Sequence, residues 1–366
     1  MIDKTGKAGL KPARPEVRIR CTEECVSKKV VTFGEVMLRL ATNRRERFTQ
    51  AREFEVTYGG GECNVAISLA HFGIDVSFMT ALPNNDIGQA CVNYIRQFGV
   101  DTSDILRQGN RLGIYYLESG ASMRASKVVY DRAGSSIAEL GPDDVNWDDV
   151  FDGMDWFHWT GITPAISNTA AETVGEATRQ AKAKGLTVSC DFNYRKNLWS
   201  GEEAQAVMKP LMSYVDVAIG NEEDADKCLA IKAEGVDVTS GELDPEAYKP
   251  VVEKLVSEFG FSQVGITLRE SQSADDNDWS AIYWDGSEIL IADKYPVRIV
   301  DRVGGGDAFS AGLIYGNIKG FESRALIDFA VASSAMAHTF HGDFNLVSES
   351  EVLAVAGGDT SGRVQR

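Results

Sequence analysis

Asp301-Arg302-Val303-Gly304-Gly305-Gly306-Asp307 is the strongest single indication of the fold in this chain. It follows an apolar run at 297–300 that predicts a strand, and it precedes a helical pattern at 308–319. Three glycines let backbone N–H groups approach an anion, and the N-terminus of a helix adds a favourable dipole. The stretch therefore predicts an α/β protein with an anion site between a strand and a helix.

Asp307 ends this glycine turn, and two interpretations of it stay open. Beside a bound anion, its carboxylate would take part in the chemistry. At the start of a helix, it would only cap free N–H groups, which is a favoured use of Asp. The chain contains neither Gly-x4-Gly-Lys-Ser/Thr nor Gly-x-Gly-x-x-Gly, so those two classes of phosphate site are disfavoured.

The rest of the chain mostly alternates predicted strands and helices. Such alternation predicts a largely parallel sheet that is covered by helices on both faces. The predicted strands lie at 30–33, 76–81, 156–159, 187–190, 215–219 and 263–268, and further helices lie at 64–72, 87–98, 169–184 and 322–340. Two β-rich stretches, at about 48–58 and 111–133, have no helix between their strands, and we interpret them as a small antiparallel lid.

Composition excludes several classes of partner. The chain has 366 residues, with 54 acidic against 37 basic side chains and a formal net charge of −17. Such a surface repels nucleic acid and anionic membranes, and no apolar run is long enough to span a bilayer. Cys21 and Cys25 have no second pair at zinc spacing, so we expect free thiols and a cytoplasmic protein. We expect residues 1–29 to be a disordered leader and 353–366 a flexible tail.

The glycine turn resembles the Asp-Thr-x-Gly-Ala-Gly-Asp motif of the ribokinase-like (PfkB) carbohydrate kinases, and the resemblance covers residues 30–352. It implies a three-layer α/β/α sandwich with a mostly parallel central sheet and a small antiparallel β lid. It also implies that Asp307 is the catalytic base and that Gly304, Gly305 and Gly306 form an anion hole for the phosphoryl group. Arg302 stands where the family has Thr, and a cation near phosphate suits that place.

A second glycine segment, Gly59-Gly60-Gly61-Glu62-Cys63-Asn64, precedes the first long predicted helix. By itself it is explained by a glycine turn and an Asn cap. It is similar to the Gly-Gly-x-x-x-Asn sugar-binding segment of the same family. The resemblance implies that Gly60 N–H and the Asn64 amide bind substrate hydroxyls.

A third group of residues bears on the substrate. Tyr130 and Arg132 share one side of a predicted lid strand, and Arg195 follows the end of the strand at 187–190. On a generic lid such residues would only decorate the surface. They resemble the pattern of those family members that phosphorylate 2-keto-3-deoxygluconate. That resemblance implies a substrate site made of Gly60, Asn64, Tyr115, Tyr130, Arg132, Ile162, Arg195 and Asp307, in which the two Arg bind the substrate carboxylate.

The nucleotide side is also implied by the resemblance. It assigns ATP to Asn193, Asn221, Thr267, Arg269, Gly304 and Gly306. Mg²⁺ would be held indirectly, through water, by Glu223 or Asp224, and a monovalent cation is a further candidate cofactor. Acids in the first turn of a helix also favour its dipole, so a purely structural interpretation of these two carboxylates stays open. The turn at 341–345 either closes the nucleotide pocket or is a plain turn.

We therefore expect an enzyme that uses ATP to phosphorylate the terminal hydroxyl of 2-keto-3-deoxygluconate, giving the 6-phosphate. An acid sugar and ATP would be its small-molecule partners, and we expect a homo-oligomer. Two alternatives remain: a kinase of the same family for a neutral sugar or nucleoside, and a non-catalytic sugar-acid sensor. His158, between Phe157 and Trp159, is expected to be a core residue without a catalytic role.

Overall fold

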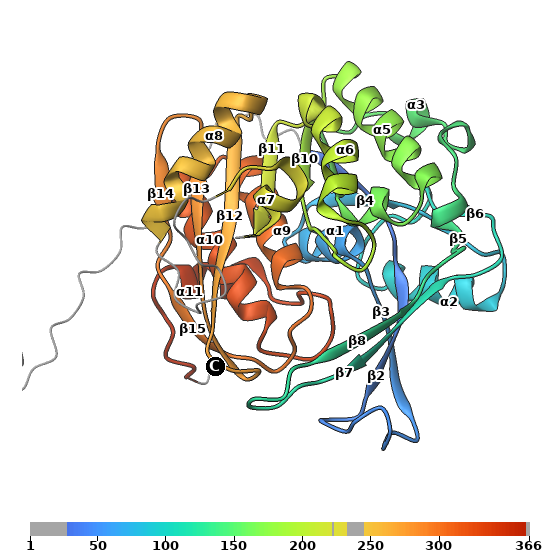
Figure 1. Ribbon diagram of the computed structural model, residues 1–366, viewed down its shortest axis with the longest axis horizontal. Coiled ribbons are helices and arrows are strands. Elements are labelled where there is room, and N and C mark those ends of the chain that lie inside the picture. The colour runs from blue at the N-terminus through green and yellow to red at the C-terminus, as the bar shows by residue number, and fades with distance from the viewer. Residues whose placement is uncertain (1–27, 222, 233–244, 364–366) are drawn as a thin grey trace, which may run out of the picture.

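A computed structural model describes residues 28–221, 223–232 and 245–363 (Figure 1). Within these residues the main sheet has nine strands in the order β14-β13-β12-β11-β10-β9-β1-β4, with β15 paired to β13. The six strands β4, β1, β9, β10, β11 and β12 run parallel to one another. The other three, β13, β14 and β15, form antiparallel pairs at one edge of the sheet. The strands are β1 (Lys29–Phe33), β4 (Asp75–Met79), β9 (Trp156–Thr160), β10 (Thr187–Asp191), β11 (Val217–Asn221), β12 (Gln263–Ser271), β13 (Asp276–Trp284), β14 (Ile289–Ile291) and β15 (Tyr295–Arg298).

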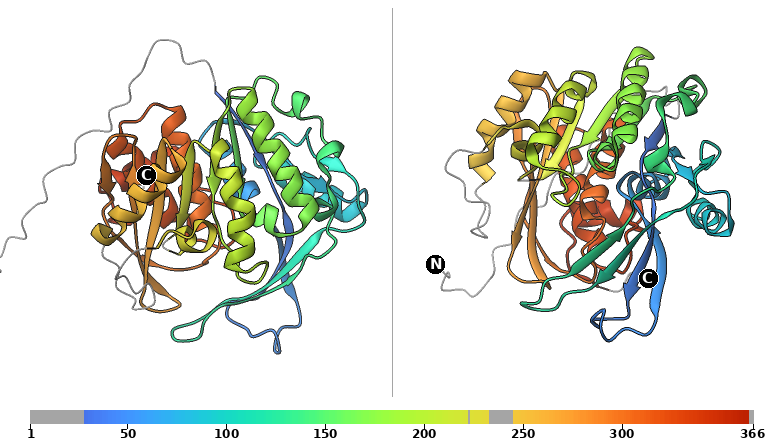
Figure 2. Two further views of the ribbon diagram at one scale, coloured as in Figure 1. Left: turned by 45° about the horizontal axis from the view of Figure 1, so that its top comes forward. Right: turned by 45° about the vertical axis from the view of Figure 1, so that its right-hand side comes forward.

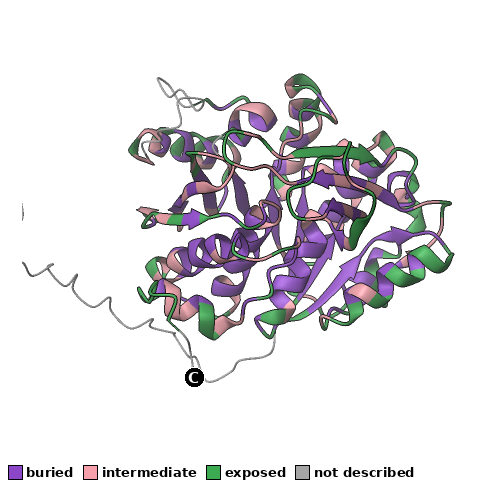
Figure 3. Ribbon diagram, turned by 90° about the horizontal axis from the view of Figure 1, so that it is seen from below, coloured by how far each residue is buried: buried purple, intermediate pink, exposed green. Residues whose placement is uncertain are grey.

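Helices cover both faces of this sheet (Figure 2). Alternate strand residues point to opposite faces. Val30 belongs to the buried cluster that contains residues of α1, α2, α9, α10 and α11, and Val31 belongs to the cluster that contains residues of α3, α5, α6, α7 and α8. The helices are α1 (Gly61–His71), α2 (Asp86–Arg96), α3 (Trp147–Val150), α4 (Ile162–Ala165), α5 (Asn168–Ala183), α6 (Gly201–Leu211), α7 (Asp224–Leu229), α8 (Lys249–Phe259), α9 (Gly305–Ile318), α10 (Ser323–Ala337) and α11 (Glu349–Ala356). Buried residues follow the sheet and the inward sides of the helices (Figure 3), which confirms the predicted three-layer α/β/α sandwich.

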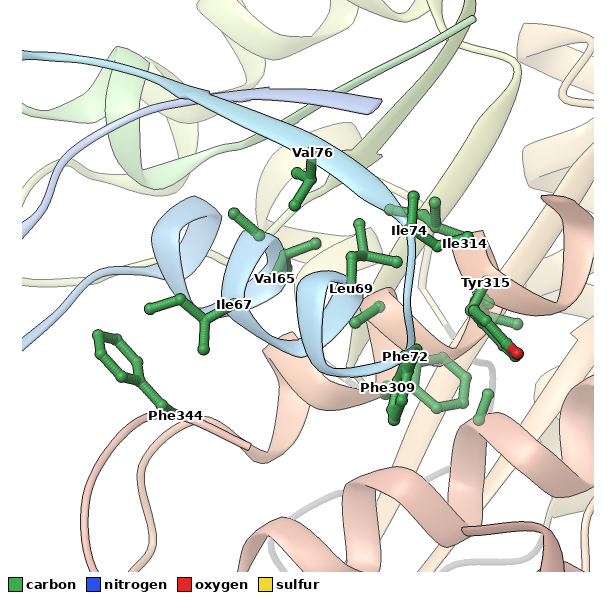
Figure 4. Packing of buried hydrophobic residues seen from close by; sticks show 14 of the residues in the cluster. Val65, Ile67, Leu69, Phe72, Ile74, Val76, Phe309, Ile314, Tyr315 and Phe344 are labelled. Atoms are coloured by element: carbon green, nitrogen blue, oxygen red, sulfur yellow. The ribbon is translucent and has the colours of Figure 1, made fainter. Parts of the chain in front are cut away.

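The packing of α1 against α9 matters most for function (Figure 4). Phe72, at the end of α1, contacts Tyr315 of α9 with ring centroids 5.2 Å apart. Val65 and Leu69 of α1 are fully buried in the same cluster as Phe309 of α9. Because the two helices begin at the two glycine segments, this apolar contact fixes those segments relative to each other.

The lid is a separate sheet in the order β3-β2-β7-β8, which extends away from the main sheet (Figure 1). Its strands are β2 (Met37–Thr42), β3 (Phe54–Gly59), β7 (Gly113–Glu118) and β8 (Lys127–Asp131), and a further two-stranded sheet joins β5 (Ala81–Leu82) to β6 (Leu106–Arg107). The outer pairs of the lid are antiparallel, and the middle pair, β2 with β7, is parallel. Strand β2 is not among the predicted strands, because a buried Arg39 interrupts its apolar pattern.

Several elements begin or end a few residues away from their predicted bounds; the strand predicted at 215–219, for example, is β11 at Val217–Asn221. The strand predicted at 297–300 is wrong at its end, because β15 ends at Arg298. The amides of Ile299 and Val300 donate to the backbone carbonyls of Asp275 and His338 instead of to a neighbouring strand. Helix α11 continues to Ala356, so the first residues of the expected tail are helical. Most of the expected leader, including Cys21 and Cys25, lies outside the described residues.

Candidate active site

A cavity of about 320 Å³ opens between the lid and the carboxyl ends of the parallel strands. It brings together nearly all of the predicted site residues, although they come from distant parts of the chain. Its lining includes Gly60, Asn64, Tyr115, Tyr130, Arg132, Ile162, Asn193, Arg195, Asn221, Asp224, Thr267, Arg269, Gly304, Gly305, Gly306 and Asp307. Glu223 is the exception, because it lines a neighbouring hollow with Tyr194 and Lys196.

Asp307 lies at the bottom of this cavity and is 9% exposed. The N-cap of α9 is Gly304, and no side chain caps the helix, so the interpretation of Asp307 as a simple cap is wrong. Its Oδ2 accepts a 2.6 Å hydrogen bond from Nδ2 of Asn64. Burial raises the pKa of Asp307 to about 6, against the opposing effects of Asn64 and Arg195. The carboxylate is therefore ionised at neutral pH and still basic enough to accept a proton.

The glycine turn leaves no room for side chains on its first two residues. Gly304 has φ +87°, and a Cβ there would lie 2.1 Å from the carbonyl oxygen of Asp343. A Cβ on Gly305 would lie 2.3 Å from Nε2 of His338, whereas one on Gly306 would meet nothing within 4 Å. The first turn of α9 therefore presents free N–H groups to the cavity without side chains in the way.

Asn64 links the two glycine segments. It lies in the first turn of α1, where its Oδ1 accepts from Gly60 N–H at 3.2 Å while its amide group donates to Asp307. Gly60 N–H, which the resemblance assigned to a substrate hydroxyl, is thus already bonded within the protein. Nearby Glu62 is fully buried, and its Oε1 accepts from Thr160 and Thr163.

The lid residues contribute one cation and two aromatic rings. Arg132 donates through Nε to Glu35 at 2.9 Å and forms an ion pair with the same carboxylate. Its guanidinium also lies 5.0 Å from the ring of Tyr130, which agrees with their predicted common side. Tyr115 donates its hydroxyl to Asp343 at 2.6 Å, so its polar group is bonded inside the protein.

The sheet edge contributes one cation and two acids. Arg195 donates to the carbonyl of Tyr194 at 3.1 Å. Asp224 is buried, and its two oxygens accept from the amides of Tyr194 and Asn221. Burial, together with the smaller effects of the Asp224 and Asp307 charges, raises the pKa of Asp191 to about 8, against the opposing charge of Arg195. Of the two acids predicted to hold Mg²⁺ through water, Asp224 lines the cavity, whereas Glu223 is exposed outside it.

Thr267 and Arg302 line the nucleotide side of the cavity, and both are hydrogen-bonded to backbone carbonyls. Thr267 bonds the carbonyl of Gly220 at 3.3 Å, and Arg302 donates to the carbonyl of Ser273 at 3.0 Å. In the turn at 341–345, His341 is exposed while Asp343 lines the cavity.

Other expectations concern residues away from the cavity. His158 is fully buried and bonds Ser189 at 2.8 Å, as expected of a core residue. Four cysteines among the described residues are buried free thiols: Cys63, Cys91, Cys190 and Cys228.

Some site residues were missed by the sequence analysis. They are Glu35, Arg39, Glu62, Asp191 and Asp343, and all five are buried polar side chains. Asp191 could have been predicted from its place at the carboxyl end of a strand, where ligands bind in open sheets. The other four have hydrogen-bond partners in distant segments, so no local pattern indicates them.

The described ranges contain no group of three or more His, Cys, Asp or Glu side chains arranged to hold a metal ion. Among the same residues, every helix is too short or too polar to cross a bilayer.

This chain is similar to carbohydrate kinases in both sequence and structure. Residues 27–349 match the model of the pfkB family carbohydrate kinases. A 2-dehydro-3-deoxygalactonokinase of Haloferax volcanii is 31% identical over 337 residues, covering 92% of this chain and 99% of the relative. A 2-dehydro-3-deoxygluconokinase of Thermoproteus tenax is 28% identical over 320 residues, covering 86% and 89%. The crystal structure of a 2-dehydro-3-deoxygluconokinase of Thermotoga maritima is 49% identical, with a TM-score of 0.87, and the match covers 90% of this chain and 100% of that one.

Proposed function

Because this chain belongs to the pfkB family of carbohydrate kinases, we propose that it transfers the terminal phosphoryl group of ATP to a 2-keto-3-deoxy sugar acid. The preferred substrate is 2-keto-3-deoxygluconate, also called 2-dehydro-3-deoxygluconate, and the product is its 6-phosphate. One observation carries this proposal: a single cavity holds a buried carboxylate on a glycine turn together with Arg132 and Arg195. The names of the relatives with 31% and 49% identity support the same substrate class.

Asp307 acts as the base in this proposal. Its carboxylate accepts the proton of the terminal hydroxyl while that oxygen bonds to the γ-phosphorus and the bond to ADP breaks. Backbone N–H groups at Gly304–Gly306 stabilise the charge on the transferring group, as phosphoryl transfer requires. Asn64 holds Asp307 in place through its 2.6 Å hydrogen bond.

Arg132 and Arg195 bind the substrate carboxylate. Arg132 uses Nε and one terminal nitrogen for Glu35, which leaves its second terminal nitrogen for the substrate. Two guanidiniums give charge-assisted, directional bonds that a neutral sugar does not use.

The donor set also fits Mg²⁺ held mainly by water and phosphate. Asp224 and Asp191 are buried carboxylates, and the charge of Asp224 adds to burial in raising the pKa of Asp191, while Arg195 opposes this rise, so a further bound cation would be favourable here. Mg²⁺ takes oxygen ligands and keeps several waters, so one or two carboxylates are enough. When bound, Mg²⁺ would neutralise charge on the phosphates; Asp224 and Asp191 are the residues that would orient its waters.

An ADP-release assay tests the proposal. Purified protein is given 2-keto-3-deoxygluconate, its galactonate epimer, fructose, ribose or adenosine. We expect turnover with the keto acids, and a higher kcat/KM for fructose, ribose or adenosine would refute the substrate assignment. Asp307→Asn should abolish turnover while calorimetry still detects sugar binding, and full activity in this variant would refute the assignment of the base.

A further inference from the structure

Four buried polar side chains form one cluster between the lid and the main domain. The Arg39 cluster consists of Arg39, Tyr115, Asp301 and Asp343, which are 3%, 4%, 4% and 5% exposed. Arg39 bonds both Asp301 and Asp343 through its two terminal nitrogens, and the hydroxyl of Tyr115 donates to Asp343. Arg39 and Tyr115 are register neighbours on β2 and β7, so one face of the lid supplies both.

Asp343 touches both glycine segments of the site. A Cβ on Gly59 would lie 2.0 Å from Oδ2 of Asp343, and one on Gly304 would lie 2.1 Å from its carbonyl oxygen. Phe344 anchors this residue by packing on Phe98, which follows the end of α2, with ring centroids 5.3 Å apart. The side chain of Asp343 therefore lies against the sugar-side segment, while its backbone lies against the anion-side turn.

Asp301 connects the cluster to the start of the glycine turn. Its Oδ1 accepts from the amide of Arg302 at 2.7 Å, and its Oδ2 accepts from the amide of Gly342 at 3.2 Å. One guanidinium thus compensates two carboxylates that hold the two ends of the site. Removing one partner of a buried ion pair leaves an uncompensated charge, so the segments that carry it must rearrange.

We infer that Arg39 and Asp343 are positioning residues for phosphoryl transfer, which hold the lid and both glycine segments in the arrangement that aligns the sugar hydroxyl with Asp307. Neither residue needs to touch the reacting atoms. The inference rests on the proposed function, since kinase turnover is its readout. It does not rest on the identity of the sugar, because the assay uses whichever sugar the wild-type protein phosphorylates. If the substrate assignment is wrong, the wild-type protein will not phosphorylate the keto acid. If the inference about Arg39 and Asp343 is wrong, the wild type will be active and the variants will keep its kcat.

The test is Arg39→Ala with and without added guanidinium. We expect kcat to fall about 100-fold, as small misplacements of reacting groups do, while the protein remains folded at the assay temperature. Guanidinium at about 20 mM, far below denaturing concentrations, should refill the space and restore kcat at least about tenfold. A residue that only stabilised the fold would leave kcat unchanged below the melting temperature.

Arg124→Met is the matched control. Arg124 pairs with Glu118 on the same lid at 2.9 Å but touches neither glycine segment, so its loss should leave kcat within about twofold of wild type. An unchanged kcat in folded Arg39→Ala overturns the inference, and so does a loss that neither guanidinium nor Arg39→Lys reverses. If Arg39→Ala does not fold, kcat is measured for the near-isosteric variant Asp343→Asn instead. We expect kcat of this variant to fall about tenfold, and a kcat equal to that of the wild type overturns the inference.

Discussion

Replacing Asn64 with Leu should move the acid limb of the pH profile to higher pH. The base works only when ionised, so kcat/KM rises with pH through the pKa of Asp307, which is about 6, and then levels off. The amide of Asn64 donates at 2.6 Å to that carboxylate and favours its ionised form. Leu has a similar size and cannot donate, so the pKa of Asp307 must rise.

The magnitude follows from the hydrogen bond. A bond to a charged group contributes about 1.5–3 kcal/mol, and one pKa unit corresponds to about 1.4 kcal/mol. Because the cavity admits water, we take the lower end and expect a shift of about one unit. At pH 6, the ionised fraction of Asp307 would then fall from about one half to about one tenth.

The assay is kcat/KM measured between about pH 5 and pH 9 for wild type, Asn64→Leu and Tyr130→Phe. Tyr130 lies on the lid, and none of its contacts in the structure joins it to Asp307, so its variant controls for titration of ATP and of the sugar acid. Asn64→Leu also loses an expected sugar contact, which lowers the whole curve without moving its limb. A limb that stays in place, or moves to lower pH, would refute the role of Asn64 as the donor that favours ionised Asp307.

Three further predictions concern other parts of the molecule. Glu35→Ala should raise KM for the sugar acid about tenfold and leave neutral sugars unaffected, because it removes the carboxylate that orients Arg132; steady-state kinetics checks this, and an unchanged KM contradicts it. Burial raises the pKa of Glu62 from 4.5 to about 7, so its contribution to stability is complete below the lower value and is lost as pH rises through the upper one. Glu62→Gln should therefore gain up to roughly 3 kcal/mol relative to wild type between about pH 5 and pH 9 in chemical unfolding, and an equal pH dependence would show that Glu62 is not the cause. The outer face of the lid carries an apolar row across all four strands, formed by Val56, Leu40, Tyr116 and Val129, which favours the homo-oligomer expected from the sequence. Val129→Asp should then give a monomer in light scattering, and a monomeric wild type would contradict that expectation.

Local sequence patterns are enough to predict the layered fold and the glycine turn at the centre of the site. Period-2 and period-3.6 patterns report which residues face a core, and the apolar strands and helices of this chain are long enough to show them. The glycine turn before Asp307 is also a local signal, because its backbone conformation and its helix start depend on neighbouring residues. The β-rich stretches predict most of the lid but not β2. In β2 an inward position is occupied by Arg39, so the strand lacks the alternation of apolar residues that would indicate it.

The pairing of the buried polar groups depends on tertiary packing and cannot be predicted from local sequence. From the sequence, Asp307 is equally compatible with a role as a helix cap. Its hydrogen bond to Asn64 of α1 joins two residues that are 243 positions apart, so no local pattern could indicate it. Glu35 with Arg132 and Arg39 with Asp343 are likewise pairs from distant segments, and the partner of a charged side chain has no period along the chain. Buried charges are tolerated only where a partner is present, so their places follow from the packing of whole elements rather than from local sequence.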